Sequence, residues 1–150
     1  MKPKTLGTLL RVVCILLALM GAAVTFLACT GWFDPGDTRA FAKALPWLSI
    51  PCWAALIAFW RVAGNIAHDH SFCAENVRCM RIIAAMAFLD TAGVIAAGAV
   101  MLARQTIGQR TIPFLACIVI LGGCVGLASL ALSVLVDRAR AIQEENDFTV

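Results

Sequence analysis

The sequence predicts an all-α fold, an integral membrane four-helix bundle, from its composition and from the distribution of its apolar residues. Of the 150 residues, 61% are hydrophobic and 14% are charged, whereas soluble domains are about half apolar and about a quarter charged. Such a chain has too little polar surface to coat a water-soluble globule. The apolar residues also gather in four long blocks without period-two alternation. Each block is expected to be helical, because lipid satisfies no backbone polar group.

The four blocks give the expected elements in chain order. We expect helices over residues 6–29, 44–63, 82–103 and 112–136. Each is long enough, because about 20 helical residues cross a hydrocarbon core of about 30 Å. The last helix is expected to continue out of the membrane, with Asn146 near its end. The whole chain then forms one four-span domain.

The first block has an alternative interpretation as a cleavable signal peptide. It has a basic start, and the stretch from Phe26 to Cys29 loosely resembles a lipoprotein cleavage box. However, Phe26 and Leu27 do not suit such a box, and the apolar run exceeds the usual signal core of about 7–15 residues. We therefore expect the block to be retained as a helix.

The connections are short. The first contains the sequence Asp34-Pro35-Gly36-Asp37, which predicts a turn because proline fixes φ and glycine permits positive φ. Residues 64–81 form the longest expected cytoplasmic connection, and residues 137–150 form a cytoplasmic tail. No segment is long enough for a soluble domain.

The distribution of basic residues predicts that both ends of the chain lie in the cytoplasm. With that topology the cytoplasmic basic residues are Lys2, Lys4, Arg11, Arg61, Arg78, Arg81, Arg138 and Arg140. The outer basic residues are Arg39, Lys43, Arg104 and Arg110. Short cytoplasmic loops carry the excess of Lys and Arg, so the topology with both ends inside is favoured.

Small residues and cysteines suggest how the helices pack. Gly122 and Gly126 form a Gly-x-x-x-Gly pair, which lets helix backbones approach closely. Packing within the monomer is favoured over a specific dimer face, and a homo-oligomer stays open. The seven scattered cysteines do not form a disulfide framework. One bridge between Cys29 and Cys52 also stays open.

Asp90 is the one carboxylate well inside an expected span. An intramembrane charge costs several kcal/mol unless it is neutralised, paired or hydrated. A structural interpretation, a protonated Asp90 hydrogen-bonded to Ser129 or Ser133, is favoured. The functional alternative is a proton or cation site, or an anchor for a ligand.

The connection 64–81 holds the one potential cluster of metal ligands. Imidazole and thiolate groups suit zinc, but the spacing of these residues is not a standard zinc pattern. They are His68, His70, Cys73 and Cys79. A polar loop is the favoured interpretation. Nothing in the sequence resembles a nucleophile with its base, or a glycine-rich phosphate loop, so we expect neither enzyme activity nor a cofactor.

Two stretches resemble a known family. The first runs from Ser71 to Arg78 (Ser-Phe-Cys-Ala-Glu-Asn-Val-Arg) and leads into Arg81-Ile82. It is similar to the Phe-Ser-x-Glu-Asn-Val signature that precedes the third helix of a bacterial family catalogued as domain of unknown function 2975. The tail from Gln143 to Val150 resembles the ending of that family, with Phe148 and Val150 in place of the usual Leu and Ile. The Pro113-Phe114 opening of the last helix also fits.

The resemblance implies a four-helix protein of the bacterial cytoplasmic membrane. Members are often encoded beside a small helix-turn-helix regulator of the Xre type, which suggests such a partner and no direct contact with nucleic acid. The candidate partner-binding residues are Phe72, Glu75, Asn76, Glu144, Glu145, Asn146 and Asp147. An acidic surface on the cytoplasmic side suits a basic, DNA-binding protein. Equally, the tail acids are expected to pair with Arg78 and Arg81 and lock the cytoplasmic face.

Three hypotheses about function follow from these observations. The leading one is a membrane-bound regulatory partner of a small helix-turn-helix regulator. The second is a transporter or channel component that uses Asp90. The third is a structural helper subunit of a larger membrane complex.

Overall fold

The computed structural model of the chain contains four long helices and confirms the predicted fold class. It describes residues 3–30, 39–67, 73–105 and 111–147. The helices are α1 (Pro3–Cys29), α2 (Arg39–Ala67), α3 (Ala74–Ala103) and α4 (Thr111–Asp147). All four are long and apolar enough to cross a membrane.

The helices extend further than the apolar blocks from which they were predicted. α2 continues to Ala67 and α3 begins at Ala74, so most of the expected loop 64–81 is helical. α4 continues past residue 136 to Asp147. The reason is physical: hydropathy marks the part of a helix that lies in hydrocarbon, and polar turns can continue the same helix outside it.

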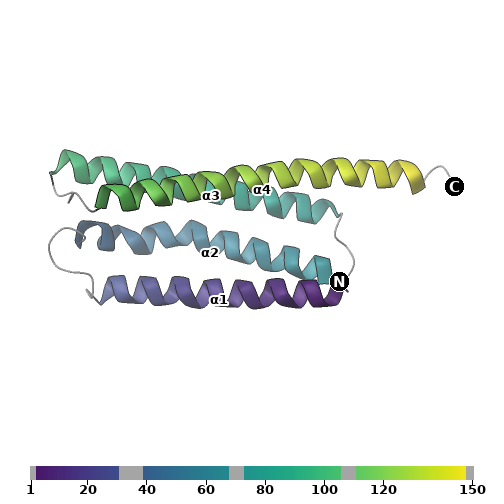
Figure 1. The fold of residues 1–150 in the computed structure, drawn as a ribbon, viewed down its shortest axis with the longest axis horizontal. Helices are drawn as coiled ribbons and strands as arrows, with labels where there is room; N and C mark the ends of the chain where they lie inside the picture. The colour runs from purple at the N-terminus through teal and green to yellow at the C-terminus, as the bar shows by residue number, and fades with distance from the viewer. Residues whose placement is uncertain (1–2, 31–38, 68–72, 106–110, 148–150) are drawn as a thin grey trace.

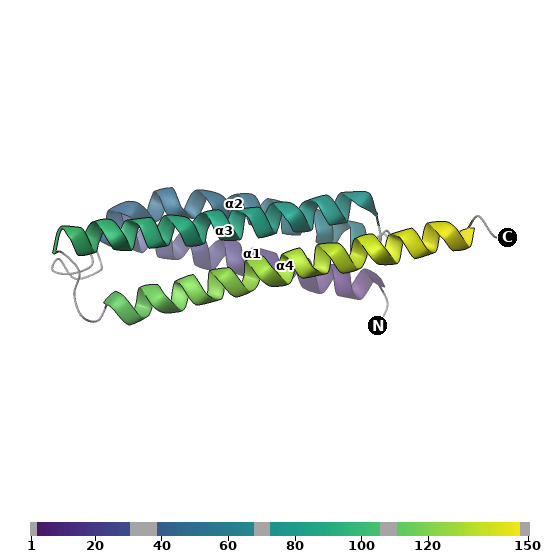
Figure 2. The same ribbon diagram turned by 90° about the horizontal axis from the view of Figure 1, so that it is seen from above.

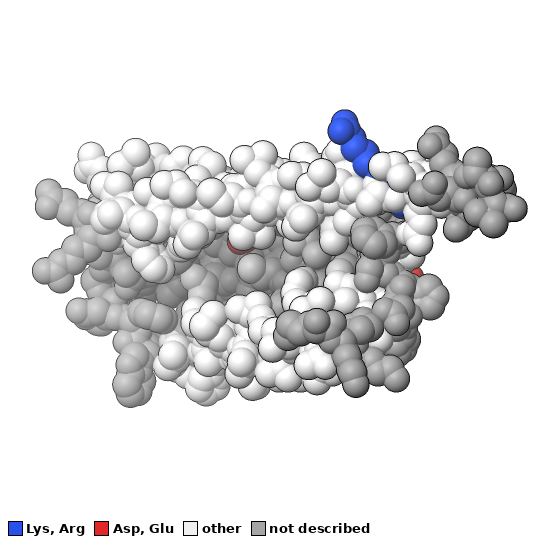
Figure 3. All heavy atoms as spheres, turned by 45° about the vertical axis from the view of Figure 1, so that its right-hand side comes forward, with Lys and Arg blue, Asp and Glu red and all other residues white. Residues whose placement is uncertain are grey.

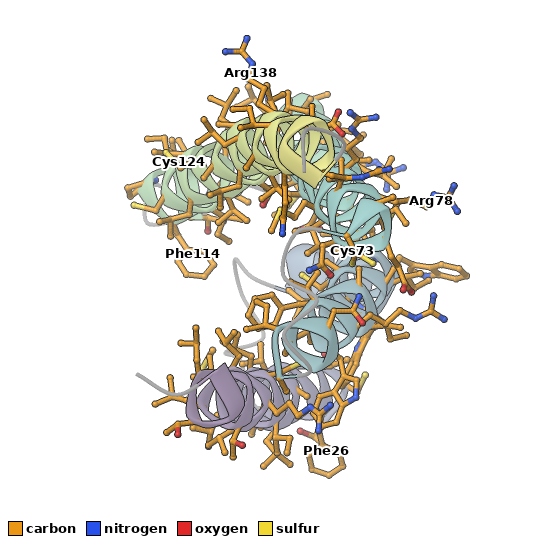
Figure 4. All side chains as sticks on the ribbon, turned by 90° about the vertical axis from the view of Figure 1, so that its right-hand side faces the viewer. Phe26, Cys73, Arg78, Phe114, Cys124 and Arg138 are labelled. Carbon is orange, nitrogen blue, oxygen red and sulfur yellow. The ribbon has the colours of Figure 1, made fainter. Side chains whose placement is uncertain are left out.

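The four helices are arranged as an open crescent. Among the described residues, α1 contacts α2, α2 contacts α3 and α3 contacts α4, and no other pair of helices is in contact. Seen along the helix axes, α1 and α4 lie at the two tips of the crescent (Figure 4). The bundle is therefore not closed, and α2 and α3 form its back.

One end of the bundle carries both termini (Figure 1). The start of α1, the end of α2, the start of α3 and the end of α4 lie there, and we call it the termini end. At this end α4 projects beyond the other three helices, as a second view also shows (Figure 2).

Buried apolar residues form two small clusters rather than one central core. Val94, Met101 and Leu115 form one cluster towards the end opposite the termini. The other consists of Ala58, Val62 and Cys79, closer to the termini end. Many large apolar side chains elsewhere are exposed. Their exposure suits a bilayer, because lipid tails are as apolar as leucine and do not drive such side chains inwards.

Candidate functional site

Asp90 lies on α3 against α2. It is 16 residues after Ala74, which places it about 24 Å along the helix. The thiol of Cys52 on α2 donates to Asp90 Oδ2 across 3.9 Å. The Cys52 side chain is exposed, while Asp90 is half-buried. The carboxyl group therefore has a weak polar partner on the neighbouring helix and is not enclosed by protein.

The serines expected beside Asp90 lie elsewhere along α4. Gly122 packs against Thr91 of α3, so it marks the level of Asp90 on α4. Ser129 and Ser133 lie seven and eleven residues beyond Gly122, about 10 and 16 Å along the helix. Ser133 is buried, and its hydroxyl donates to the carbonyl of Leu130 at 2.7 Å. Cys52 takes the place of the expected serine partner, because the register of the helices decides which side chains meet.

The surface around the middle of the bundle is almost without charge. A space-filling view shows an acidic group at mid-length, in a hollow between an upper and a lower ridge, with Lys and Arg visible only near one end (Figure 3). Of the described acidic residues, Glu75 and Asp137 lie towards the termini end, whereas Asp90 lies in the middle of a helix. A carboxyl group in such surroundings can hold a proton, bind a cation or anchor a ligand.

The second candidate region is the termini end. Glu75 lies in the first turn of α3, and its side chain is exposed. Arg81 of α3 pairs with Asp137 of α4 at 3.1 Å. From Asp137 the helix α4 continues for ten residues to Asp147, about 15 Å at the standard rise. We call residues 138–147 the α4 arm.

The arginines of this region show which surface is accessible. The side chains of Arg78 and Arg138 point away from the bundle (Figure 4). Arg81 pairs with Asp137, and the expected ionic lock between the tail acids and Arg78 or Arg81 stays a prediction. The side chains of Glu144, Glu145, Asn146 and Asp147 lie outside the described residues, as does Phe72.

Asn76 has a structural position that differs from that of Glu75. It is 1% exposed, and its Oδ1 accepts a hydrogen bond from Asn65 Nδ2 of α2 at 2.9 Å. Asn65 Nδ2 also donates to Cys73 Sγ at 3.7 Å. Adjacent residues on a helix point about 100° apart, so Glu75 faces outwards while Asn76 joins α3 to α2. Of these two residues, only Glu75 contributes to an accessible surface.

The potential metal ligands divide between two environments. Cys79 is buried in the cluster with Ala58 and Val62, and Cys73 precedes the first residue of α3. His68 and His70 lie outside the described residues. Within the part of the chain that the structure describes, no three His, Cys, Asp or Glu side chains are grouped as metal ligands. Cys29 and Cys52, which a bridge could have joined, are both free thiols.

Sequence reasoning missed two residues of these regions. The sequence suggests Cys52 only as a possible disulfide partner of Cys29, and no motif in it contains Asn65. A thiol in the middle of a span gives no signal of its partner. Asn65 did carry a signal, because an amide at the end of an apolar block must find a hydrogen bond when it is buried.

Comparisons with known proteins give a family and no activity. A family model described as "Protein of unknown function (DUF2975)" matches residues 39–150, a range that contains α2, α3 and α4. No curated protein and no solved structure matches the chain.

Proposed function

This chain belongs to the DUF2975 family of proteins of unknown function, and we propose that it is a membrane-bound regulatory partner of a small helix-turn-helix transcription regulator. In this proposal the termini end faces the cytoplasm, as the excess of basic residues predicts. The regulator docks there and is held away from DNA.

The observation that carries the proposal is the α4 arm. α4 continues for about 15 Å past the Arg81–Asp137 ion pair. The residues of this extension lie beyond the apolar part of the bundle. By sequence the arm bears Glu144, Glu145 and Asp147. The exposed Glu75 lies at the same end of the molecule. Together they supply negative charge on one side of the membrane.

Charge complementarity identifies the class of partner. A protein that binds DNA through phosphates carries a basic surface. The acidic end of the arm, residues 144–147, attracts that surface and speeds association. A regulator bound through its basic surface is unable to use the same residues on DNA, so membrane docking lowers its availability.

The test is affinity purification of the tagged protein from its native membranes in mild detergent, followed by mass spectrometry. We expect a small helix-turn-helix protein to be recovered. Recovery should be lost when Glu144, Glu145 and Asp147 are changed to alanine together. The matched control is Arg138→Gln, which changes an outward-pointing charge of the same arm and should retain the partner.

Two outcomes would overturn the proposal. One is the recovery of no soluble regulator with the unaltered protein. The other is equal recovery with the triple alanine variant. Consistent recovery of a larger membrane complex instead would favour the structural helper subunit.

A second candidate function is supported by the Asp90–Cys52 contact. A half-buried carboxyl group with an exposed thiol beside it, near the middle of a spanning helix, is the arrangement expected of a proton or cation site. This function makes the protein a small transporter or channel component. Proteoliposomes under a proton or monovalent cation gradient should show flux that Asp90→Asn abolishes and Asp137→Asn leaves unchanged. Absence of flux under every gradient would remove this candidate.

A further inference from the structure

Arg11 is the one charged residue in the candidate span Thr5–Leu27 of α1. Its guanidinium lies over the ring of Trp60 on α2, with Cζ 5.6 Å from the ring centroid. Its Nη2 also lies close to Gly64, because a Cβ built there would be 3.2 Å away from it. The ring and the glycine thus form a contact surface for the guanidinium on α2.

This contact surface lies near one end of the membrane-length helices rather than at their middle. Gly64 is three residues before the end of α2 at Ala67. Gly7, in the first turns of α1, packs against Ala63 and Ala67. The Arg11 side chain therefore reaches towards the termini end, as long basic side chains do when they carry their charge to the level of the lipid headgroups.

Arg11 has no counter-ion in the described part of the chain. Its Nε is buried and makes no hydrogen bond there, and the ion pair found among the described residues joins Arg81 to Asp137. A guanidinium offers five donors in a planar fork that matches a phosphate. A cation held in position without an anion among the described residues, at the end of a membrane-length helix, favours the binding of an anionic group.

We propose that Arg11, Trp60 and Gly64 form a binding site for the phosphate of an anionic phospholipid. The site is open to lipid on its α2 side, because Trp60 is 42% exposed. An anionic headgroup is preferred to a zwitterionic one, because the latter carries its own cation beside the phosphate. The exposed Arg61, adjacent to Trp60, adds positive charge at this end. This inference does not depend on the proposed function.

The test is native mass spectrometry of the purified protein in detergent, titrated with phosphatidylglycerol or with phosphatidylcholine. We expect phosphatidylglycerol to bind more tightly than phosphatidylcholine. Arg11→Gln should weaken phosphatidylglycerol binding about fivefold, the effect of one basic group near an anionic surface. The matched control is Arg78→Gln, which removes the same charge from an exposed side chain at the same end and should change binding little.

A second variant keeps the test decisive if Arg11→Gln does not fold. Arg11→Lys retains the charge but loses the planar fork, so it should bind phosphatidylglycerol about two- to threefold more weakly. Unchanged binding by both Arg11 variants would overturn the proposal. So would an equal loss in Arg78→Gln, equal affinity for phosphatidylcholine, or displacement of the lipid by millimolar inorganic phosphate.

Discussion

The two edge helices, α1 and α4, are joined to the rest of the crescent in different ways. α4 packs on α3 through glycines near the middle of the two helices, where Gly122 meets Thr91 and Gly126 meets the ring of Phe88. α1 packs closely on α2 near the termini end, where Gly7 meets backbone and Cβ atoms of Ala67. Cys14 adds a weak bond to the carbonyl of Leu56 at 3.6 Å.

The difference shows that the two edges differ in how well they tolerate a larger residue in place of a glycine. The atoms opposite Gly7 belong to backbone and a Cβ, which cannot move without moving the helix. The closest atoms opposite Gly122 and Gly126 belong to side chains, which can change rotamer at a cost. The matched family region, residues 39–150, includes the α3–α4 contact and leaves α1 outside it.

The largest effect is expected from Gly7→Ala. The new Cβ would lie 2.5 Å from Ala67 Cβ and 2.8 Å from Ala67 Cα, so α1 must move away from α2. We expect the free energy of unfolding in detergent micelles to fall by about 1–3 kcal/mol, as overpacking does. The control is Gly21→Ala on the same helix, where no atom lies within 4 Å of the new Cβ. It should gain up to about 1 kcal/mol from helix propensity, and a similar loss in both variants would contradict the comparison.

A smaller loss is expected from Gly122→Ala. The new Cβ would overlap Thr91 Oγ1, and the threonine can turn only by giving up its hydrogen bond to Ala87 O, which is 2.7 Å long. We expect a loss of about 1 kcal/mol, the value of one such hydrogen bond. Gly123→Ala, which meets no atom within 4 Å, should not be destabilised. Thermal unfolding of both proteins in the same detergent checks this difference.

Loss of a polar contact between α2 and α3 should lower the free energy of unfolding less than the glycine substitutions at either edge. Asn76→Ala removes the hydrogen bond from Asn65, and hydrogen bonds between membrane helices average about 0.6 kcal/mol in double-mutant cycles. A cycle with Asn65→Ala measures the coupling directly. A coupling near zero would mean that the two asparagines do not hold the ends of α2 and α3 together.

The smallest effect is expected from Asp137→Asn. The side chains of Arg81 and Asp137 are 58% and 48% exposed, so water and salt screen the pair. We expect a loss of about 0–0.5 kcal/mol that shrinks further as salt is raised. Unfolding measured at low and at high salt gives this value. A loss that is large and independent of salt would show that the pair, and not the glycines, holds α4 to the bundle.

The residues of the candidate regions were only partly predictable. Asp90 was predicted because a carboxylate within an apolar block is rare, and Glu75 because it is the glutamate of the stretch that resembles the family signature. The thiol of Cys52, which meets Asp90, and the amide of Asn65, which meets Asn76, both lie on α2. Their pairing depends on helix register, which no local pattern in the sequence records.

By itself, the sequence determined the four membrane-length helices, their order and the presence of an acidic residue far from either end of a span. These follow from composition and length, because hydrocarbon admits only segments whose backbone bonds to itself. The tertiary structure alone decided that the bundle is open, that Asp90 meets Cys52 and that Asn76 is buried while Glu75 is exposed. In lipid no hydrophobic force selects one helix pairing, so the close fit of small residues and a few polar contacts make that choice.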